Sequence, residues 1–335
     1  MKELLIKENY QSVLNLIETE VAIKLVKDNF ERNLAEALNL MRVSAPLFIF
    51  PSTGLNDELN GIERRVEFKL RDIEEKAEIV QSLAKWKRNA LARYQFKEGT
   101  GLYTDMNAIR CDEELDNLHS AYVDQWDWEK IINKSDRNEA FLKETVKKIY
   151  GAFLKTAETV YMAFPKLKTK LPQDIYFIST QELENLYPNL SPKEREYQIC
   201  KSKGAVFVMQ IGANLKNGLP HDGRAADYDD WKLNGDILLY YNELDIAFEI
   251  SSMGIRVDEN SIVEQLKSKK EEAKLNNPYV QGILNKKLPY TIGGGIGQSR
   301  LCMFLLKKAH IGEVQASLWN EADVEKLETK NIFLL

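Results

Sequence analysis

The chain has 335 residues, a hydrophobic content of 44%, a charged content of 29% and a formal net charge of −5. These values are ordinary for a globular enzyme with a large core, and the negative charge argues against a dedicated nucleic-acid binder, which is usually basic. Residues 1–4 begin no signal peptide, and no apolar run approaches the ~20 residues of a membrane span, so no membrane partner is expected.

Cysteine and histidine usage gives neither a disulfide nor a zinc signature. Cys111, Cys200 and Cys302 are isolated, which indicates a reducing compartment and predicts a cytoplasmic protein. Each cysteine is expected to be a small buried side chain rather than a nucleophile. The three histidines are far apart and do not form a zinc motif. No repeat or flexible linker divides the chain, so residues 1–335 are predicted to form a single domain.

Residues 12–40 predict a helix, in one or two pieces. Apolar side chains recur there at three- and four-residue spacing, from Ile23 through Met41. Residues 42–50 then resemble a strand interrupted by Pro46, and because proline cannot donate to a sheet ladder, this strand should lie at a sheet edge or a subunit contact. The helix and strand are a candidate dimer interface, although ordinary core packing explains them equally well.

A polar loop is predicted at residues 54–61, before two short strands at 65–69 and 79–83. Asp57 in this loop is either a turn former or a site carboxylate, and the loop alone favours the turn.

A helix is predicted over residues 84–91, and its first turns carry Lys85, Lys87 and Arg88. Cations at a helix N-terminus oppose the macrodipole. Such a cluster is usually a solvated basic face, but anionic ligands would also explain it.

A hairpin is predicted next, with strands at residues 102–110 and 122–129 joined by a polar loop. Alternation places one set of side chains (Asp124, Trp126, Trp128) on one face and the other set (Gln125, Asp127, Glu129) on the opposite face. A polar face that carries Gln125, Asp127 and Arg110 over an aromatic back is typical of a half-exposed antiparallel sheet. It suits the floor of a binding site.

The middle of the chain is predicted to be scaffold. An amphipathic helix is expected over residues 136–164, with Asp136 as N-cap and Glu139 at the N3 position. It is followed by a strand at 175–179, a helix that begins at the capping box of residues 191–194, and an apolar strand at 204–211.

Carboxylates are concentrated in residues 221–231, together with Arg224. Strands predicted at 235–240 and 246–250 carry Asp236 and Glu249 inside apolar segments. Buried carboxylates are costly unless they pair with cations or a metal, and hard oxygen ligands suit Mg²⁺ that shares its shell with phosphates. The alternative is that both carboxylates simply face solvent.

Residues 291–300 contain the pattern Gly293-x-Gly295-x-Gly297-x-x-Arg300, followed by an apolar run at 301–306 that predicts a buried helix. Glycines allow close backbone approach, and helix starts bind anions. Arg300 in a first helical turn is unfavourable unless an anion is present. The stretch matches neither the Rossmann nor the P-loop signature, and its plain alternative is a glycine-rich turn before a core helix.

Arg110, Arg256 and Arg300 together with two strand-borne carboxylates point to a polyphosphate, because arginine forks and Mg²⁺ commonly hold one. The glycine pattern without a Rossmann or P-loop context points to ATP on an antiparallel sheet. This combination resembles the catalytic core of class II aminoacyl-tRNA synthetases. The helix and strand ending at Pro46 resemble their first motif, Arg110-Cys111-Asp112-Glu113 with the returning strand resembles the second, and the glycine–Arg300 pattern resembles the third. The resemblance implies an α+β fold with a mostly antiparallel β-sheet flanked by helices.

Longer blocks resemble one family more closely, that of the bacterial ammonia-dependent asparagine synthetases (asparagine synthetase A, aspartate–ammonia ligases). The blocks are residues 82–88, 122–129, 227–231, 251–256 and 291–300, and the resemblance runs from about residue 5 to the C-terminus. It implies a ligase that converts ATP, L-aspartate and ammonia into AMP, pyrophosphate and L-asparagine through β-aspartyl-AMP.

The resemblance also implies roles for individual residues. Asp57, Lys87 and Arg110 are the expected catalytic residues, with Asp57 as the group that binds ammonium and accepts its proton. Aspartate is expected to contact Ser82, Gln125, Asp127, Arg224, Asp229, Ser251 and Ser252. ATP is expected to contact Arg110 at its α-phosphate and Arg300 at its γ-phosphate, with Arg256, Gly295 and Gly297 nearby. Asp236 and Glu249 are the expected Mg²⁺ ligands. Lys87, Arg224 and Arg256 all remain candidates for the cation that binds the aspartate α-carboxylate.

Other reaction partners are not expected. The sequence has no basic appendage that would read tRNA, so no nucleic-acid partner is predicted. Glutamine-dependent synthetases resemble amidotransferases with an N-terminal cysteine, whereas residue 2 is Lys2, so nitrogen should come from free ammonia. A homodimer is the family-based expectation. The alternatives are a non-catalytic paralogue and an enzyme that acylates another acceptor.

Overall fold

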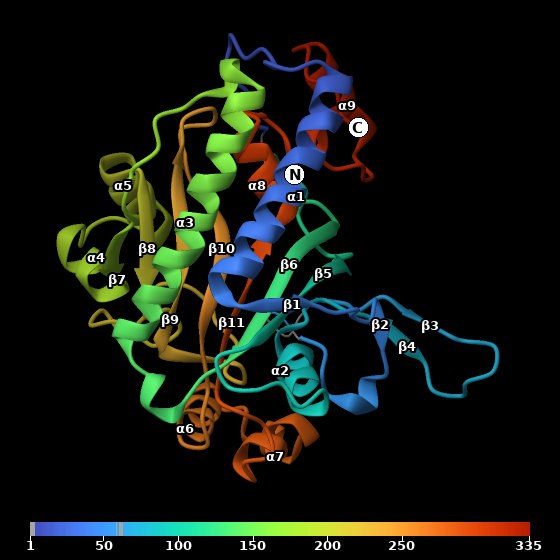
Figure 1. Ribbon diagram of the computed structural model, residues 1–335, viewed down its shortest axis with the longest axis vertical. Helices are drawn as coiled ribbons and strands as arrows, with labels where there is room; N and C mark the ends of the chain where they lie inside the picture. Colours follow the sequence, from blue (N-terminus) through green and yellow to red (C-terminus); the bar gives the residue numbers. More distant parts are fainter. Residues whose placement is uncertain (1–3, 58, 60–62) are drawn as a thin grey trace.

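The computed structural model describes residues 4–57, 59 and 63–335. Residues 1–3 and positions 58, 60 and 61 of the predicted polar loop therefore lie outside the described residues. In the described ranges, eight strands form a central sheet in the order β1-β5-β6-β11-β10-β9-β8-β7 (Figure 1). They are β1 (Leu40–Arg42), β5 (Gly101–Ile109), β6 (Tyr122–Ile131), β7 (Tyr176–Ser179), β8 (Ala205–Met209), β9 (Asp229–Tyr241), β10 (Ile246–Arg256) and β11 (Thr291–Gly297).

The pairing within this sheet is mostly antiparallel. Only the two outer pairs, β1 with β5 and β7 with β8, are parallel among the described strands. A smaller sheet is formed by β2 (Phe48–Ile49), β4 (Ala77–Ile79) and β3 (Glu67–Phe68), in that order. The segment around Pro46 thus joins β1 at the edge of one sheet to β2 at the edge of the other, which confirms the predicted edge position.

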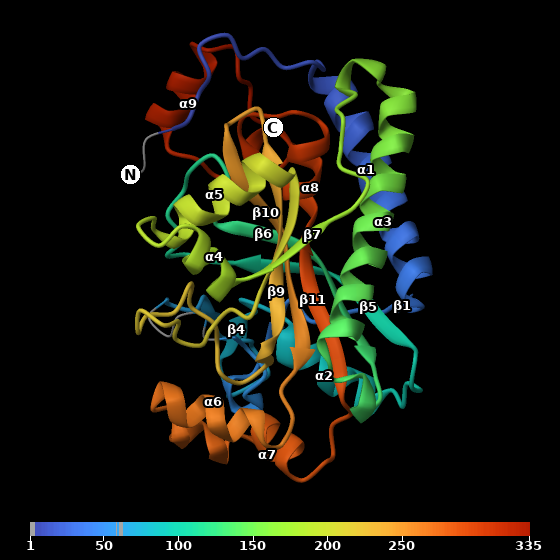
Figure 2. The same cartoon turned by 90° about the vertical axis from the view of Figure 1, so that its left-hand side faces the viewer.

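Helices surround the sheet. They are α1 (Leu16–Leu38), α2 (Ala84–Arg93), α3 (Glu139–Ala163), α4 (Thr180–Leu186), α5 (Pro192–Lys203), α6 (Ser261–Lys269), α7 (Pro278–Leu284), α8 (Gln298–Leu305) and α9 (Glu321–Glu328). Figure 2 shows α1 and α3 side by side along one face of the sheet. No described helix combines the length and apolar character that a membrane crossing requires.

The main core lies between the sheet and helices α1, α3 and α8. Trp126 and Trp128 of β6 are fully buried there, and the Phe30 ring of α1 lies 4.8 Å from the Trp126 ring. The predicted stripe on α1 is buried at every position from Ile23 to Leu38, because its three- and four-residue spacing places these side chains on one helix face. The alternation predicted for residues 124–129 is therefore confirmed on its aromatic side.

Several predictions about local structure are wrong, among them the strand predicted at 79–83, since β4 ends at Ile79. Helix α3 begins at Glu139 rather than 136, and its N-cap is Asn138, which accepts a hydrogen bond from the Phe141 N–H at 3.0 Å. Asp136 instead caps the 3₁₀ turn before it by accepting from the Asn133 N–H at 3.1 Å. Cys111 is exposed, although the other two cysteines are buried as expected.

The glycine stretch is a strand, not a loop. Residues 291–297 form β11, between β6 and β10, and only at Gln298 does α8 begin. The period of two in Gly-x-Gly-x-Gly is therefore the period of a strand, in which alternate residues face the same side.

Candidate active site

A cavity of about 500 Å³ is lined by residues of β6, β10 and β11 and of the loops around them. All but one of the predicted site residues line it: Asp57, Ser82, Lys87, Arg110, Gln125, Asp127, Arg224, Asp229, Glu249, Ser251, Ser252, Arg256, Gly295, Gly297 and Arg300. The exception is Asp236, which bonds to the lining residue Arg224. Residues from seven separate segments thus converge on a single cavity.

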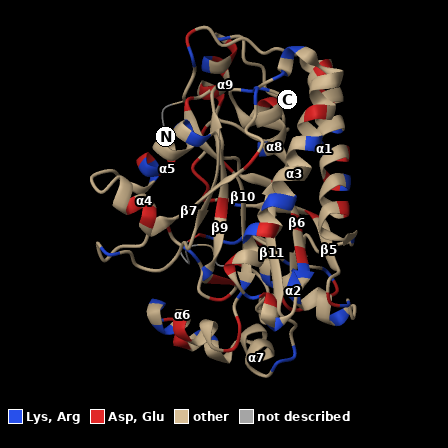
Figure 3. Ribbon diagram, turned by 60° about the vertical axis from the view of Figure 1, so that its left-hand side comes forward, with Lys and Arg blue, Asp and Glu red and all other residues tan. Residues whose placement is uncertain are grey.

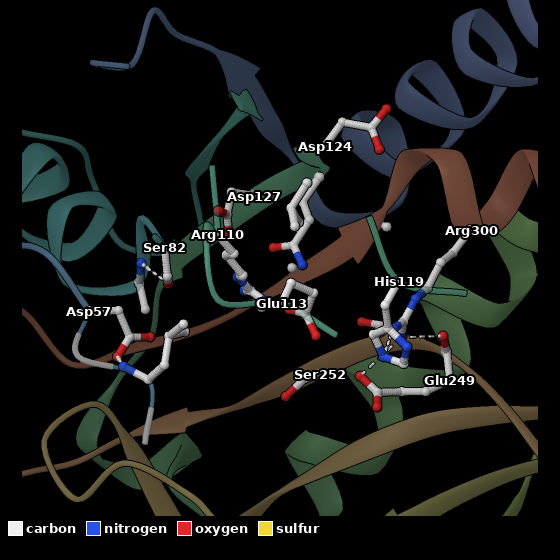
Figure 4. Close-up of a pocket in the computed structure, with 18 of the residues that line it drawn as sticks. Asp57, Ser82, Arg110, Glu113, His119, Asp124, Asp127, Glu249, Ser252 and Arg300 are labelled. Carbon is white, nitrogen blue, oxygen red and sulfur yellow. Dashed lines mark hydrogen bonds and ion pairs between the residues drawn. The ribbon is translucent and has the colours of Figure 1, made fainter. Parts of the chain in front are cut away.

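The cavity has two chemically different ends. Figure 4 shows Asp57 and Ser82 at one end and Arg300, His119 and Glu249 at the other, with Arg110 and Asp127 between them. Arg110 directly follows β5, and its backbone N–H donates to the Ala121 carbonyl at 2.8 Å, so the hairpin with β6 fixes its position. An elongated anion with a reactive group at one end would fit this arrangement.

The floor of the cavity is built by β6 and β11 together. Gly293, Gly295 and Gly297 stand opposite Glu129, Asp127 and Gln125, in register. A Cβ at Gly293 would overlap the Glu129 carboxylate, and a Cβ at Gly295 would overlap the Gln125 side-chain oxygen. Glycine is needed at these positions because the polar side chains of β6 lie across them. The glycines therefore make room for these side chains rather than for a bound anion.

This floor predicts that two glycine substitutions differ in effect. Gly293→Ala should lower the free energy of unfolding by about 1–3 kcal/mol, because its methyl group meets a buried ion pair that cannot move away. Gly295→Ala should leave stability nearly unchanged, since Gln125 lines an open cavity and can rotate, but it should weaken ligand binding. Urea unfolding measures the stability of both variants, and a binding assay measures their affinity for ligand. Equal losses of stability in Gly293→Ala and Gly295→Ala would contradict the proposed difference between the two positions.

Buried ion pairs lie on the cavity side of the floor, at the Gly293 end. Arg256, only 2% exposed, donates from Nη2 to Glu129 at 2.7 Å and also pairs with Asp229. Burial alone would raise the pKa of Glu129, but Arg256 holds this pKa below its usual range. The guanidinium of Arg256 is held by two carboxylates, and it fixes the positions of Asp229 and Glu129 in turn. Arg256 also lines the cavity.

The cations of α2 are buried rather than solvated, so the solvated basic face considered for them is wrong. Lys87 bonds to Asp127 and to the Gly294 carbonyl at 2.9 Å. Lys85 pairs with Asp227 at 2.7 Å, and Arg88 donates to the carbonyls of Val257 and Pro289. Burial lowers the pKa of Lys87 although Asp127 acts against it. Figure 3 shows the cationic and anionic residues next to each other around α2.

A bulge in β10 brings two serines to the site. The register with β9 shifts between Glu249 and Ser251. Phe248 and Ile250 face the core before the shift, whereas Met253 and Ile255 face it afterwards. One inserted residue thus changes which side chains face the cavity, and such bulges often redirect side chains at functional sites. Simple alternation in the sequence does not reveal this change.

The predicted metal ligands lie on neighbouring strands, and each is close to an arginine. Asp236 bonds to Arg224, and the Glu249 carboxylate lies 3.9 Å from Arg300. Burial, with a contribution from the charge of Glu249, raises the pKa of Asp236 to about 7. No group of three or more potential metal-binding side chains occurs in the described part of the chain. Glu249 lines the cavity and Asp236 lies on the neighbouring strand behind Arg224, and such a pair of carboxylates fits Mg²⁺, which is usually held by one or two carboxylates plus substrate phosphates and water.

Asp57 is 4% exposed, and its carboxylate accepts from the Leu59 N–H at 3.0 Å. Burial raises the pKa of Asp57, although the charge of Lys85 opposes this shift. A carboxylate with a raised pKa is a better proton acceptor at neutral pH than an ordinary one. The polar loop is therefore more than a turn, because it carries a buried titratable group into the cavity.

Several buried polar atoms of the cavity lack a hydrogen-bond partner within the described structure. They are Nε of Arg110, Oδ2 of Asp127, Nε of Arg224 and Oγ of Ser251. Buried polar groups are normally satisfied, so these atoms indicate that a ligand or water supplies their partners. The set contains donors and an anionic acceptor, as an amino acid with its ammonium and carboxylate groups requires.

His119 is a lining residue that sequence reasoning missed. Its Nε2 lies 3.0 Å from Nη2 of Arg300, and its Nδ1 lies 2.8 Å from the Asp116 carboxylate. Because arginine can only donate, Nε2 must be the acceptor and Nδ1 carries the proton. A neutral His119 thus orients Arg300. Its signal in the sequence is its position in the polar loop before β6, whereas histidine spacing tests only for a zinc site.

Comparison with known proteins points to one family. A family model described as aspartate–ammonia ligase matches residues 17–331. The aspartate–ammonia ligase of Ruminiclostridium cellulolyticum is 58% identical over 336 residues, covering 100% of both chains. That of Fusobacterium nucleatum is 60% identical over 326 residues, covering 97% of this chain and 99% of the relative.

Solved structures show the fold at much lower identity. The asparaginyl-tRNA synthetase of Pyrococcus horikoshii, complexed with asparaginyl-adenylate, aligns with a TM-score of 0.63 and 15% identity over 90% of this chain and 70% of the other. The aspartyl-tRNA synthetase of Entamoeba histolytica aligns with a TM-score of 0.61 and 13% identity over 94% and 64%. The catalytic core of class II aminoacyl-tRNA synthetases, predicted from three motifs, is thereby confirmed as the fold.

Proposed function

The chain belongs to the aspartate–ammonia ligase family, and we propose that its cavity joins L-aspartate to ammonia at the expense of ATP, giving AMP, pyrophosphate and L-asparagine. The observation that carries this proposal is the order of groups along the cavity: Arg300, then Arg110, then Asp57 (Figure 4). This is the order in which a triphosphate tail, the reacting α-phosphate and the incoming nitrogen would lie.

Aspartate binds between the floor and β10. The unpartnered Asp127 oxygen, together with Asp229 and Gln125, accepts hydrogen bonds from the substrate ammonium. Lys87 and Arg224 are the cations for its carboxylates, and Ser82, Ser251 and Ser252 donate further hydrogen bonds. Arg256 serves this site by holding Asp229 in place. A substrate carboxylate near arginine or lysine gains a charge-assisted bond, which is roughly twice as strong as a neutral one.

The first half-reaction makes a leaving group. A β-carboxylate oxygen attacks the α-phosphorus of ATP, the bond to the bridging oxygen breaks, and pyrophosphate leaves. Arg110 stabilises the α-phosphate charge and Arg300 the γ-phosphate, while Gly295 and Gly297 leave room for the side chains of Gln125 and Arg300 that lie over them. Mg²⁺ bound by Asp236 and Glu249 would neutralise phosphate charge. Catalysis here is positioning and charge stabilisation.

The second half-reaction forms the amide. Asp57 binds ammonium and takes one proton, and the resulting ammonia attacks the acyl carbon of β-aspartyl-AMP. The tetrahedral intermediate gives a second proton to water and expels AMP. The raised pKa of Asp57 supports this role, since the group must accept a proton and later release it.

We also propose the setting in which the enzyme works. Residues 1–335 act as one catalytic unit, and the reaction needs no tRNA. The exposed apolar side chains of Ile17, Val21 and Met41, 76%, 58% and 58% exposed, support a homodimer through α1 and β1. The three unpaired cysteines support a location in the cytoplasm. Sedimentation that shows only a ~39 kDa monomer would contradict the dimer.

Product analysis tests the proposed function. Purified protein is incubated with ATP, Mg²⁺, aspartate and ammonium, and nucleotides and amino acids are separated. We expect asparagine and AMP in equal amounts. Formation of ADP, or of no product unless tRNA is added, would reject the proposal in favour of a different ligase or a synthetase. A non-catalytic paralogue would give no product at all.

A further inference from the structure

A second cavity, of about 340 Å³, adjoins the Asp57 end of the active site. The residues that line only this second cavity are Lys85, Asp227, Lys269, Glu271 and Lys274. The residues that line both cavities are Asp57, Leu59 and residues 223–225. The two cavities therefore share one wall, and Asp57 is part of that wall. A small molecule that left the second cavity towards the active site would pass Asp57.

We propose, on the basis of the proposed function, that this second cavity is the passage by which ammonia or ammonium reaches the adenylate. Two substrates, a nucleotide and an amino acid, must share the larger cavity of about 500 Å³. The nucleotide covers the side from Arg110 to Arg300, so a nitrogen source that arrives after adenylation needs access from the Asp57 end. The second cavity opens there.

The walls of the passage carry mixed charge. Four basic side chains (Lys85, Arg224, Lys269, Lys274) and three acidic ones (Asp57, Asp227, Glu271) line it. Several are already paired: Lys85 lies 2.7 Å from Asp227, both 5% exposed, and Lys274 lies 2.8 Å from Glu271. A paired lining neither repels ammonium strongly nor traps it, which a passage requires.

At the inner end, ammonium gives one proton to Asp57, and the resulting ammonia forms the new C–N bond. The intermediate then gives its second proton to water, the bond to the AMP oxygen breaks, and AMP leaves with that electron pair. Lys85 helps because its charge lies near Asp57 and favours release of the proton afterwards. No oxidant or further reactant is needed.

Blocking the passage tests the proposal. Glu271→Trp and Lys269→Trp each place a large ring in the lining of the second cavity only, and Lys267→Trp, on the exposed side of α6, is the matched control. We expect the KM for ammonium to rise by about tenfold or more in the two blocking variants, because access of the nucleophile is hindered. Hydroxylamine, a larger nucleophile, should be affected more. The KM values for aspartate and ATP and the aspartate-dependent ATP–pyrophosphate exchange should stay within about twofold of the wild-type values.

The outcomes separate the passage from the proposed function. Folded variants that exchange pyrophosphate normally and keep the wild-type KM for ammonium would overturn the passage alone. An equal rise in Lys267→Trp would also overturn it, because the effect would then not depend on the cavity. A wild-type protein that makes no asparagine would instead reject the proposed function. A blocking variant that exchanges pyrophosphate at the wild-type rate is folded. If Glu271→Trp or Lys269→Trp does not fold, the remaining variant still tests the passage.

Discussion

Asp57→Asn is expected to separate the two half-reactions. Asparagine formation should fall by about 10²–10⁴-fold, the usual contribution of a positioned general base. Aspartate-dependent ATP–pyrophosphate exchange should stay within a few-fold of the wild-type rate, since Asp57 lies at the end of the cavity away from Arg300 (Figure 4). Asparagine keeps the oxygen that accepts the Leu59 N–H, so the loop should retain its shape. Isotope exchange without ammonia and product formation with ammonia measure the two steps separately.

Asp222→Asn is the matched control for this substitution. Asp222 also lines the cavity, but its side chain is 51% exposed, and we assign it no role. Both half-reactions should survive in it nearly unchanged. If Asp57→Asn likewise kept both, or lost both together, the assignment of Asp57 to the ammonia step would be wrong.

Arg300→Ala is expected to abolish most ATP use with little loss of stability. The Arg300 side chain is 23% exposed, and its guanidinium bonds to His119 and the Glu249 carbonyl, so its removal leaves no unpaired buried charge. Loss of a preorganised phosphate contact typically costs about 10²–10³-fold in rate. Both pyrophosphate exchange and asparagine formation should fall together, which distinguishes this variant from Asp57→Asn. Arg300→Lys should recover part of the activity, because it keeps the charge without the bidentate fork.

Arg93→Ala serves as the control, since Arg93 ends α2 outside the cavity and stacks near the Tyr94 ring. It should change neither rate. Thermal unfolding of all three arginine variants checks stability. A fall in melting temperature of Arg300→Ala large enough to explain the loss of activity would contradict a role in binding phosphate.

Patterns with a short period allowed much of the fold to be predicted. The apolar stripe of α1 and the alternation in β6 each lie within a few consecutive residues of the sequence, and each indicates which face of the element is buried. The capping box at Ser191 and Glu194 also occurs as predicted, with Ser191 accepting from the Glu194 N–H. The start of α3 was misplaced because Asp136 and Asn138 are both good caps, and the choice between them depends on the 3₁₀ turn that Asp136 closes.

The site was predicted mainly through resemblance, and the missing parts are those that depend on three-dimensional contacts. The sequence suggests close backbone approach to an anion at the glycines of β11, because it does not reveal that Gln125, Asp127 and Glu129 lie across them. Lys87 was expected to be a solvated cation or a ligand contact, but its buried partner Asp127 is 40 residues away. His119 acts through Arg300, 181 residues later, and no local pattern records such a pair.

The most direct test of the central claim follows an oxygen atom. Aspartate labelled with ¹⁸O in its β-carboxylate is converted in the presence of ATP, Mg²⁺ and ammonium, and the products are analysed by mass spectrometry. Attack of the carboxylate on the α-phosphorus predicts that one labelled oxygen is transferred to AMP and none to pyrophosphate. Label in inorganic phosphate with formation of ADP, or AMP without label, would contradict the β-aspartyl-AMP intermediate and with it the roles given to Arg110 and Asp57.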